Sequence, residues 1–196
     1  MSNQVSLRAI FLDADGVLWK DIGPGGIFSG RRDAIQNLEF LSSNLAKAQL
    51  RIVVSNQTFA ARKKMSYFKF KTYTKSFFNS LIKLGLLDDF AICYHHPNAQ
   101  NILLRKKCEC RKPLPGLLNF MARKHNINLR KSALIGDRVT DIQSGAAVGI
   151  DHLYLIVNDR MLEININSSQ QSLYQIFMPL KDLKEFTLLK EFINEN

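Results

Sequence analysis

Short apolar segments alternate with longer amphipathic segments along most of this sequence, and that alternation restricts the fold more than any other feature. Five short segments rich in β-branched and apolar residues are predicted strands: residues 5–13, 51–55, 89–94, 132–135 and 152–157. Helical spacing of apolar residues predicts helices over residues 30–48, 60–84, 113–126 and 140–148. Strands that alternate with helices favour a parallel sheet covered on both faces. The prediction is an α/β doubly wound parallel sheet in three layers.

The length of the chain favours a single domain. Its 196 residues are enough to bury one substantial core, so we expect one domain spanning residues 1–196. About forty residues separate Asp15 from Ser55, which leaves room for a loop and a helix but not for a separate cap domain. An amphipathic helix is expected over residues 180–193.

Hydropathy and cysteine content predict a location in the cell. No apolar run approaches the roughly 20 residues needed to span a bilayer, and residues 1–8 lack the apolar stretch of a secretory signal. The three cysteines cannot all pair within one chain, and two of them are one residue apart, which suits metal binding in a reducing compartment. We expect a cytoplasmic protein with no membrane partner, and the oligomeric state stays open.

The chain is strongly basic. A formal net charge of +10 favours anionic partners such as phosphorylated metabolites, nucleic acid or acidic surfaces. Much of the excess comes from a basic run at residues 62–75, made up of Arg62, Lys63, Lys64, Lys69, Lys71 and Lys75. Such a run most often forms a solvated helix face. Nucleic-acid binding is the alternative, although the aromatic residues nearby fit a packed helix equally well.

The first predicted strand ends in Asp13-Ala14-Asp15-Gly16, which places two carboxylates at a glycine turn. Carboxylates in such a position must be solvated, paired or bound to metal, because burial of an unpaired charge is costly. Mg²⁺ prefers hard oxygen ligands of this kind and also neutralises phosphate. Taken alone, the pattern is a weak signal and more often caps a turn.

Three further polar elements follow in order. They are Ser55-Asn56-Gln57 after the second strand, the isolated cation Lys112, and Gly136-Asp137-Arg138-Val139-Thr140-Asp141 after the fourth strand. Ser55 and Asn56 offer donors to a phosphate oxygen, and an ammonium is a compact charge suited to phosphate or to an anionic nucleophile. Ligands of doubly wound sheets bind beyond the carboxyl ends of the strands, where these residues fall.

This ordered set resembles the haloacid dehalogenase superfamily of phosphohydrolases over residues 10–157. The resemblance implies that Asp13 is the nucleophile and Asp15 the general acid and base. It also implies that Ser55, Asn56 and Lys112 bind phosphate. Mg²⁺ would be held by Asp13, Asp137 and the main-chain carbonyl of Asp15. The chemistry is coherent, because a carboxylate that attacks phosphorus forms an aspartyl phosphate, which water then hydrolyses.

A loop at residues 93–110 has the spacing of a metal site. It carries three cysteines and a histidine, namely Cys93, His95, Cys108 and Cys110. Three thiolates and one imidazole suit tetrahedral Zn²⁺, and four protein ligands make such a site structural rather than catalytic. His95 is preferred over His96 because it completes the Cys-x-His pattern. The alternative is three buried free cysteines.

The loop continues as Cys110-Arg111-Lys112-Pro113, which resembles the zinc-loop branch of the superfamily. That branch contains heptose bisphosphate phosphatases and related histidinol-phosphate phosphatases. The resemblance implies a carbohydrate substrate, D-glycero-D-manno-heptose 1,7-bisphosphate, on a route to lipopolysaccharide, with Arg111 and Arg138 on its second anionic group. The chain departs from the family at Ala14 and Phe59, and it has Arg138 where lysine is common, which affects substrate identity.

Three other functions compete with the heptose phosphatase. A histidinol-phosphate phosphatase would use the same chemistry on another small molecule. A nucleic-acid 3′-end phosphatase would fit the basic charge and would show salt-dependent retention of DNA or RNA. A zinc-stabilised interaction module would need no catalytic set, so the presence of Asp13, Asp15, Lys112 and Asp137 argues against it.

Overall fold

The computed structural model describes residues 7–20, 26–44, 49–62, 65–157, 160–164 and 174–179. The strands are β1 Arg8–Leu12, β2 Gln49–Asn56, β3 Asp89–Cys93, β4 Ala133–Gly136, β5 His152–Val157, β6 Arg160–Ile164 and β7 Tyr174–Pro179. The helices are α1 Arg31–Asn44, α2 Phe59–Arg62, α3 Tyr67–Lys83, α4 Gly116–His125 and α5 Val139–Ala146, with short 3-10 turns η1 Gly26–Phe28, η2 Ile102–Leu104 and η3 Leu129–Lys131.

The described strands form one sheet in the order β3-β2-β1-β4-β5-β6-β7. The first five strands run parallel, which confirms the predicted doubly wound α/β sheet. The sequence did not predict β6 and β7, which extend the sheet in antiparallel fashion. β6 begins three residues after β5 ends, and so short a connection joins only antiparallel strands.

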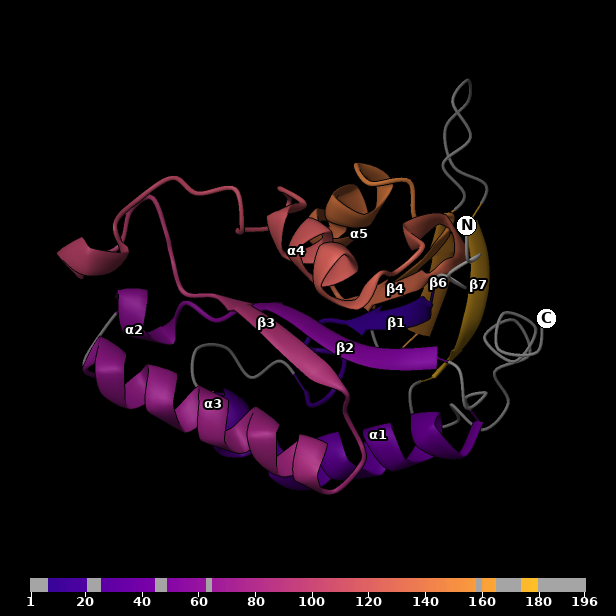
Figure 1. Ribbon diagram of the computed structural model, residues 1–196, viewed down its shortest axis with the longest axis horizontal. Coiled ribbons are helices and arrows are strands. Elements are labelled where there is room, and N and C mark those ends of the chain that lie inside the picture. The colour runs from indigo at the N-terminus through magenta and orange to yellow at the C-terminus, as the bar shows by residue number, and fades with distance from the viewer. Residues whose placement is uncertain are drawn as a thin grey trace, which may run out of the picture.

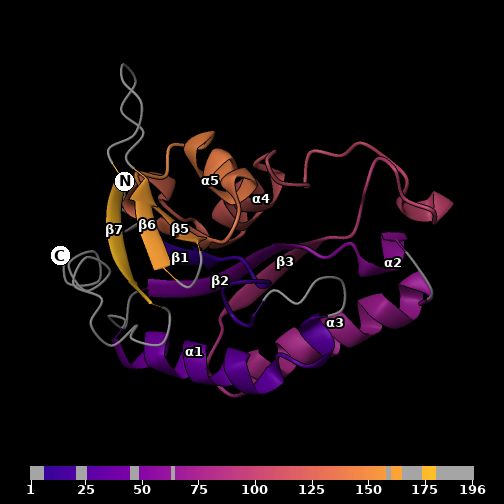
Figure 2. The same cartoon turned by 180° about the vertical axis from the view of Figure 1, so that it is seen from behind.

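Helices cover both faces of the sheet. Figure 1 shows α1 and α3 on one side and α4 and α5 on the other, and the view from behind in Figure 2 shows the same three layers. The side chains of β1 alternate between these layers, as the period of a strand requires. Ile10 and Leu12 pack with Phe70 and Phe78 of α3, whereas Phe11 packs on the opposite face with residues of α4 and α5.

One expected helix is divided in the structure, and another lies outside the described residues. The helix predicted over residues 60–84 is divided, because α2 ends at Arg62 and α3 begins at Tyr67. Ser66 directly precedes α3 with φ −56° and ψ 134°, outside the helical region, and serine is favoured at such a position over a helix interior. The helix expected at residues 180–193 lies outside the described residues. Within the described part of the chain, no helix is both long and apolar enough to cross a membrane.

The strand order positions the functional site. β1 lies between β2 and β4, so the connection from β1 leads to one side of the sheet and the later strands add on the other side. Ligands of open α/β sheets bind beyond the carboxyl ends of the strands at such a reversal. Between β1 and β2 the described residues form η1 and α1.

Candidate active site and metal cluster

A pocket of about 280 Å³ lies beyond the carboxyl ends of β1, β2 and β4. Its lining residues are Asp13, Asp15, Asn56, Gln57, Thr58, Phe59, Arg62, Arg111, Lys112, Arg138, Val139, Thr140 and Asp141. Most of the predicted catalytic and phosphate-binding residues therefore meet in one pocket. Ser55 is buried just below it and accepts a hydrogen bond from Gln57 Nε2 at 3.2 Å.

The centre of the pocket is a buried group of opposite charges. Lys112 Nζ lies 2.9 Å from Asp13 Oδ1, forms an ion pair with Asp141 Oδ1, and donates to the carbonyl oxygen of Val54 at 3.0 Å. Lys112 Nζ is thus surrounded by three oxygen atoms of the protein, two of which belong to carboxylates. Burial alone would lower the pKa of Lys112, but the charges of Asp13 and Asp141 raise it. Lys112 therefore stays charged and fixes the Asp13 carboxylate in place.

The backbone of Lys112 is held from β2. The side chain of Asn56 donates to the carbonyl oxygen of Lys112 and accepts from its backbone N–H, both at 3.2 Å. The Lys112-Pro113 peptide bond that follows is cis. Asn56, predicted as a phosphate ligand, thus uses its amide to position Lys112 while also lining the pocket.

Asp15 is oriented by two neutral donors. Trp19 Nε1 donates to Asp15 Oδ1 at 2.8 Å, and Gln57 Nε2 donates to Asp15 Oδ2 at 2.7 Å. Trp19 and Gln57 are themselves buried, so the carboxylate is held from two directions by fixed groups. This arrangement keeps the Asp15 side chain at the pocket wall, apart from the carboxylates around Lys112.

Three carboxylates converge where a cation would bind. Oxygens of Asp13, Asp137 and Asp141 all lie within 4.8 Å of one another. Lys112 pairs with Asp13 and Asp141, and Arg138 lies near Asp137. An oxygen-only donor set of this kind fits Mg²⁺. Gly16 has φ +77°, and a side chain there would overlap Asp137. Glycine at this turn thus lets the β1 loop approach the β4 loop closely enough to group the carboxylates.

Asp141 is a buried carboxyl group with charged neighbours on both sides of its titration. Burial raises the pKa of Asp141, the nearby charge of Asp13 adds to the shift, and Lys112 opposes it. Asp141 also accepts a hydrogen bond from the backbone N–H of Arg138 at 3.0 Å, at the beginning of α5. The carboxylate is thus built into the fold of the β4–α5 turn.

Both predicted substrate-binding arginines lie at the pocket wall. Arg111 is half-buried and donates to the carbonyl oxygen of His95 at 3.2 Å, and burial lowers its pKa. Arg138 is exposed, with Nε 3.8 Å from Asp137 Oδ2. Arg62, which the sequence placed in a solvated basic run, also lines the pocket.

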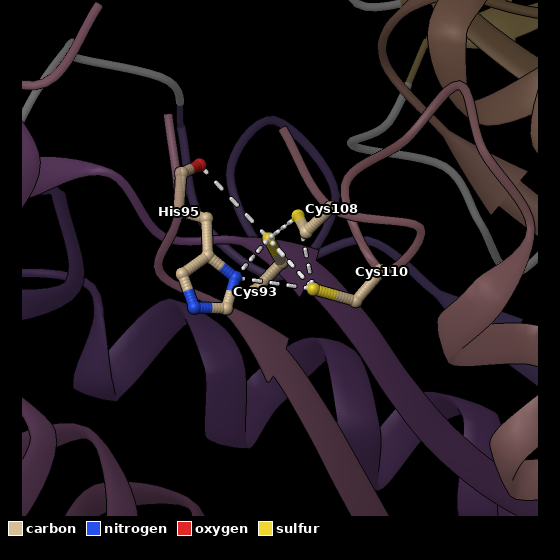
Figure 3. Close-up of side chains that lie close together, drawn as sticks. All are labelled: Cys93, His95, Cys108 and Cys110. Carbon is tan, nitrogen blue, oxygen red and sulfur yellow. Dashed lines mark hydrogen bonds between the residues drawn. The ribbon is translucent and has the colours of Figure 1, made fainter. Parts of the chain in front are cut away.

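The predicted zinc ligands form one cluster (Figure 3). Sulfur–sulfur distances are 3.7 Å for Cys93–Cys108, 3.3 Å for Cys93–Cys110 and 3.2 Å for Cys108–Cys110. His95 Nδ1 lies 3.3 Å from Cys110 Sγ and 3.8 Å from Cys93 Sγ. Zn–S bonds of about 2.3 Å in a tetrahedron separate the sulfurs by about 3.8 Å, so the donor set fits zinc after a small expansion.

The chemistry of the cluster also suits a metal. Hydrogen bonding with Cys93, Cys108 and His95 lowers the pKa of Cys110 to about 5 despite burial. The pKa of Cys93 is raised by its hydrogen bond to Cys110 and by burial. His96 points to a different partner, because its Nδ1 accepts from the backbone N–H of Asn98 at 3.1 Å. The geometry therefore agrees with His95, rather than His96, as the fourth donor.

Sequence reasoning missed Asp141, Gln57 and Trp19 as members of the site. Asp141 and Gln57 stand inside motifs that were recognised, and only their burial against charged partners identifies their roles. Trp19 lies four residues after Asp15, and no local pattern distinguishes it from a core tryptophan.

Comparison with known proteins agrees with this geometry. A family model of HAD-hydrolase-like proteins matches residues 109–156. The D-glycero-beta-D-manno-heptose-1,7-bisphosphate 7-phosphatase of Yersinia pestis is 32% identical over 159 residues, which cover 77% of this chain and 81% of the relative.

Two solved structures share the fold. A protein assigned as a HAD-like phosphatase from Mesorhizobium loti has a TM-score of 0.70 at 22% identity, covering 96% of this chain and 86% of that one. The D,D-heptose 1,7-bisphosphate phosphatase of B. bronchiseptica, solved with magnesium and phosphate, has a TM-score of 0.53 at 23% identity, covering 76% and 80%. Given the sequence identity to the Yersinia enzyme and the shared fold, this chain belongs to the heptose-1,7-bisphosphate 7-phosphatase family of HAD-like hydrolases.

Proposed function

We propose that this chain is a Mg²⁺-dependent phosphatase that removes the 7-phosphate of D-glycero-D-manno-heptose 1,7-bisphosphate. The observation that carries the proposal is the buried Asp13 carboxylate, held by Lys112 at the base of a pocket lined by several arginines. A fixed anionic nucleophile beneath cationic walls suits a substrate with two phosphates. The name of the Yersinia relative supports the same substrate.

In the first step, a carboxylate oxygen of Asp13 attacks phosphorus and forms an aspartyl phosphate, while the bond between phosphorus and the sugar oxygen breaks. Asp15 gives a proton to the departing sugar oxygen. Trp19 and Gln57 donate to the two oxygens of Asp15 and so hold its carboxyl group at the pocket wall. The positive charge of Lys112 offsets the negative charge that gathers around Asp13.

In the second step, water attacks the phosphorus of the aspartyl phosphate. Asp15, now a carboxylate, takes a proton from that water, and the bond between Asp13 and phosphorus breaks. Inorganic phosphate leaves and Asp13 returns to its carboxylate form. Asp15 thus serves first as acid and then as base, and its fixed orientation suits both proton transfers.

The carboxylates of Asp13 and Asp137 and the main-chain carbonyl of Asp15 would hold Mg²⁺. When bound, the ion would offset charge on the transferring phosphoryl group. Asp141 belongs to the same carboxylate group, and its ion pair with Lys112 gives it a supporting position. Ser55, Asn56 and Lys112 would lie on the side of the transferred phosphate, and Arg111 and Arg138 on the side of the second.

Cys93, His95, Cys108 and Cys110 would hold a structural Zn²⁺. The loop would then form a rigid wall of the pocket, because Arg111 follows Cys110 directly and contacts the carbonyl of His95. We further propose that the phosphatase forms one domain without a cap and acts in the cytoplasm on a small phosphorylated sugar.

The test is release of inorganic phosphate in the presence of Mg²⁺. The substrates are both anomers of heptose 1,7-bisphosphate, histidinol phosphate and a 3′-phosphorylated oligonucleotide. Asp13→Asn serves as the inactive variant and Asp33→Asn, at an exposed position of α1, as the matched control. We expect preference for a heptose anomer, full activity in Asp33→Asn, and loss of turnover without loss of circular dichroism in Asp13→Asn.

Other outcomes change specific parts of the proposal. Preference for histidinol phosphate or the oligonucleotide replaces the substrate and keeps the mechanism. Near-native turnover by Asp13→Asn removes Asp13 as the nucleophile. Release from none of the substrates favours a zinc-stabilised interaction module.

A further inference from the structure

The loop between the zinc ligands carries two exposed aliphatic side chains at its tip. Ile102 is 78% exposed and Leu103 is 64% exposed, whereas Leu104, the next residue, is buried. In Figures 1 and 2 the part of the chain near residue 100 projects at one end of the molecule, beside α2. These side chains take no part in the phosphatase site, because neither lines the pocket.

The backbone holds the two side chains outward. Asn101 accepts a hydrogen bond from the backbone N–H of Leu103 at 3.0 Å and so caps η2. The carbonyl oxygen of Leu104 accepts from the backbone N–H of His96 at 3.0 Å, and Gln100 donates to the carbonyl oxygen of Ala61 in α2. These hydrogen bonds hold the loop at Leu104 and at α2. Ile102 and Leu103 are therefore exposed on an ordered turn.

Cations follow the aliphatic pair directly. Arg105, Lys106 and Lys107 are all exposed, and we refer to these three residues with Ile102 and Leu103 as the η2 patch. Exposed Arg62 of α2 and Lys69 of α3 add positive charge at neighbouring elements. An apolar tip beside several cations is the composition of a segment that lies in a lipid interface.

Most of the formal net charge of +10 lies in this part of the chain. Residues 59–108 contain ten lysines and arginines and only two acidic residues, Asp88 and Asp89. Asp88 pairs with Arg51, and Asp89 with Lys124 and His125, all of which lie outside that segment. The cations of the η2 patch are thus not neutralised by the acidic residues of their own segment.

We propose that the η2 patch docks the enzyme onto an anionic lipid surface, with Ile102 and Leu103 entering the headgroup region and Arg105, Lys106 and Lys107 contacting lipid phosphates. Attraction of the cations to the anionic surface and burial of the two aliphatic side chains both favour this attachment. The attachment is peripheral and does not cross the bilayer. It differs from the expectation, drawn from the sequence, of no membrane partner.

Two other occupants fit the patch less well. A nucleic acid would meet the cations, but aliphatic side chains offer no ring on which a base stacks. A second copy of the chain would bring like charges together, which opposes pairing through the same patch. Anionic lipid is complementary to both the charge and the apolar tip.

The experiment is cosedimentation of the full chain with vesicles. One set contains phosphatidylcholine alone, and the other contains equal parts of phosphatidylcholine and phosphatidylglycerol, each at low and at physiological salt. The variants are Ile102→Ser/Leu103→Ser and Arg105→Gln/Lys106→Gln/Lys107→Gln. The matched control is Phe120→Ser, an exposed apolar position on α4. Phosphate release and zinc content of each variant show that the rest of the protein is intact.

We expect wild-type chain and Phe120→Ser to bind only the anionic vesicles, more weakly at higher salt. The aliphatic double variant and the cation triple variant should each bind at least about tenfold more weakly, with unchanged phosphate release. Equal binding to both vesicle types, absence of binding to either, or undiminished binding by the double variant overturns the proposal. So does a wild-type dimer in light scattering that the double variant abolishes, or retention of labelled single-stranded nucleic acid that requires Ile102 and Leu103.

Discussion

The indole Nε1 of Trp19 lies 2.8 Å from Oδ1 of Asp15, four residues earlier in the chain. Trp19 is buried and packs edge-on against Phe77 of α3, with ring centroids 5.6 Å apart. A side chain of the hydrophobic core thus carries a donor to the proposed acid and base. The packing of α3 on the sheet therefore fixes the direction of a catalytic carboxylate.

Trp19→Phe is expected to lower kcat about tenfold with little change in KM. Phenylalanine keeps an aromatic ring in the core but removes the donor to Asp15, and a hydrogen bond to a charged group contributes about 1.5–3 kcal/mol. Steady-state kinetics with the substrate identified above measures the change. Phe77→Leu is the matched control, because it alters packing around the indole and leaves the hydrogen bond.

The control is expected to lower the melting temperature without a matching loss of kcat. If Trp19→Phe retains native kcat, or if Phe77→Leu loses as much activity as Trp19→Phe, the indole acts through packing alone and its orienting role is wrong.

The sequence predicted the five parallel strands because each combines apolar character with a polar turn at its carboxyl end. It predicted the metal cluster because Cys-x-His and Cys-x-Cys spacing is local. Asp141 was harder, because its burial against Lys112 depends on a contact between residues 29 positions apart in the chain. β6 was missed because Arg160 and Glu163 interrupt the apolar pattern of this five-residue strand, although Asn158-Asp159 is typical of a tight turn.

Gly16→Ala is expected to lower phosphatase activity roughly 100-fold and to weaken the response to Mg²⁺. Residue 16 has φ +77°, and an added Cβ would overlap the Asp137 side chain, so the β1 and β4 loops must separate. Displacement of a reacting group by about 1 Å has effects of this size. Phosphate release over a series of Mg²⁺ concentrations measures both changes.

Gly85→Ala separates backbone strain from the steric overlap. Gly85 has φ +70° but nothing within 4 Å of its added Cβ. Both variants should lose about 1–2 kcal/mol of unfolding free energy from the left-handed backbone, and only Gly16→Ala should lose activity. Equal activity of the two variants would mean that the contact between Gly16 and Asp137 has no part in forming the site.

The metal cluster is expected to hold about one zinc per chain, and His95→Ala should remove it. Loss of one donor from a closed site also removes folding free energy, so the melting temperature should fall by more than about 5 °C. His96→Ala is the matched control, because His96 contacts Asn98 instead of the sulfurs. Elemental analysis and thermal unfolding with and without a chelator measure both properties. A metal-free native protein that a chelator does not affect would contradict the zinc assignment.

Asp89 should make part of the stability depend on pH. Its Oδ2 lies 2.5 Å from Lys124 Nζ and 2.6 Å from His125 Nε2, at the end of α4. Burial alone would raise the pKa of Asp89, but these hydrogen bonds and that from the Phe90 backbone lower it. In the window between the folded pKa and the unfolded value of about 3.9, the unfolded state binds more protons, so stability falls as pH falls.

Asp89→Asn should therefore lose about 0.5–1 kcal/mol of unfolding free energy near neutral pH, where the wild-type carboxylate is charged. The loss is small because its partners are partly exposed to solvent. The difference from wild type should shrink as pH falls below about 4, because the wild-type carboxyl becomes neutral as it passes through its folded pKa. Urea unfolding over that pH range measures the difference. Asp151→Asn, at an exposed position just before β5, is the matched control. A constant loss at every pH in Asp89→Asn would assign the effect to shape or backbone hydrogen bonding rather than to charge.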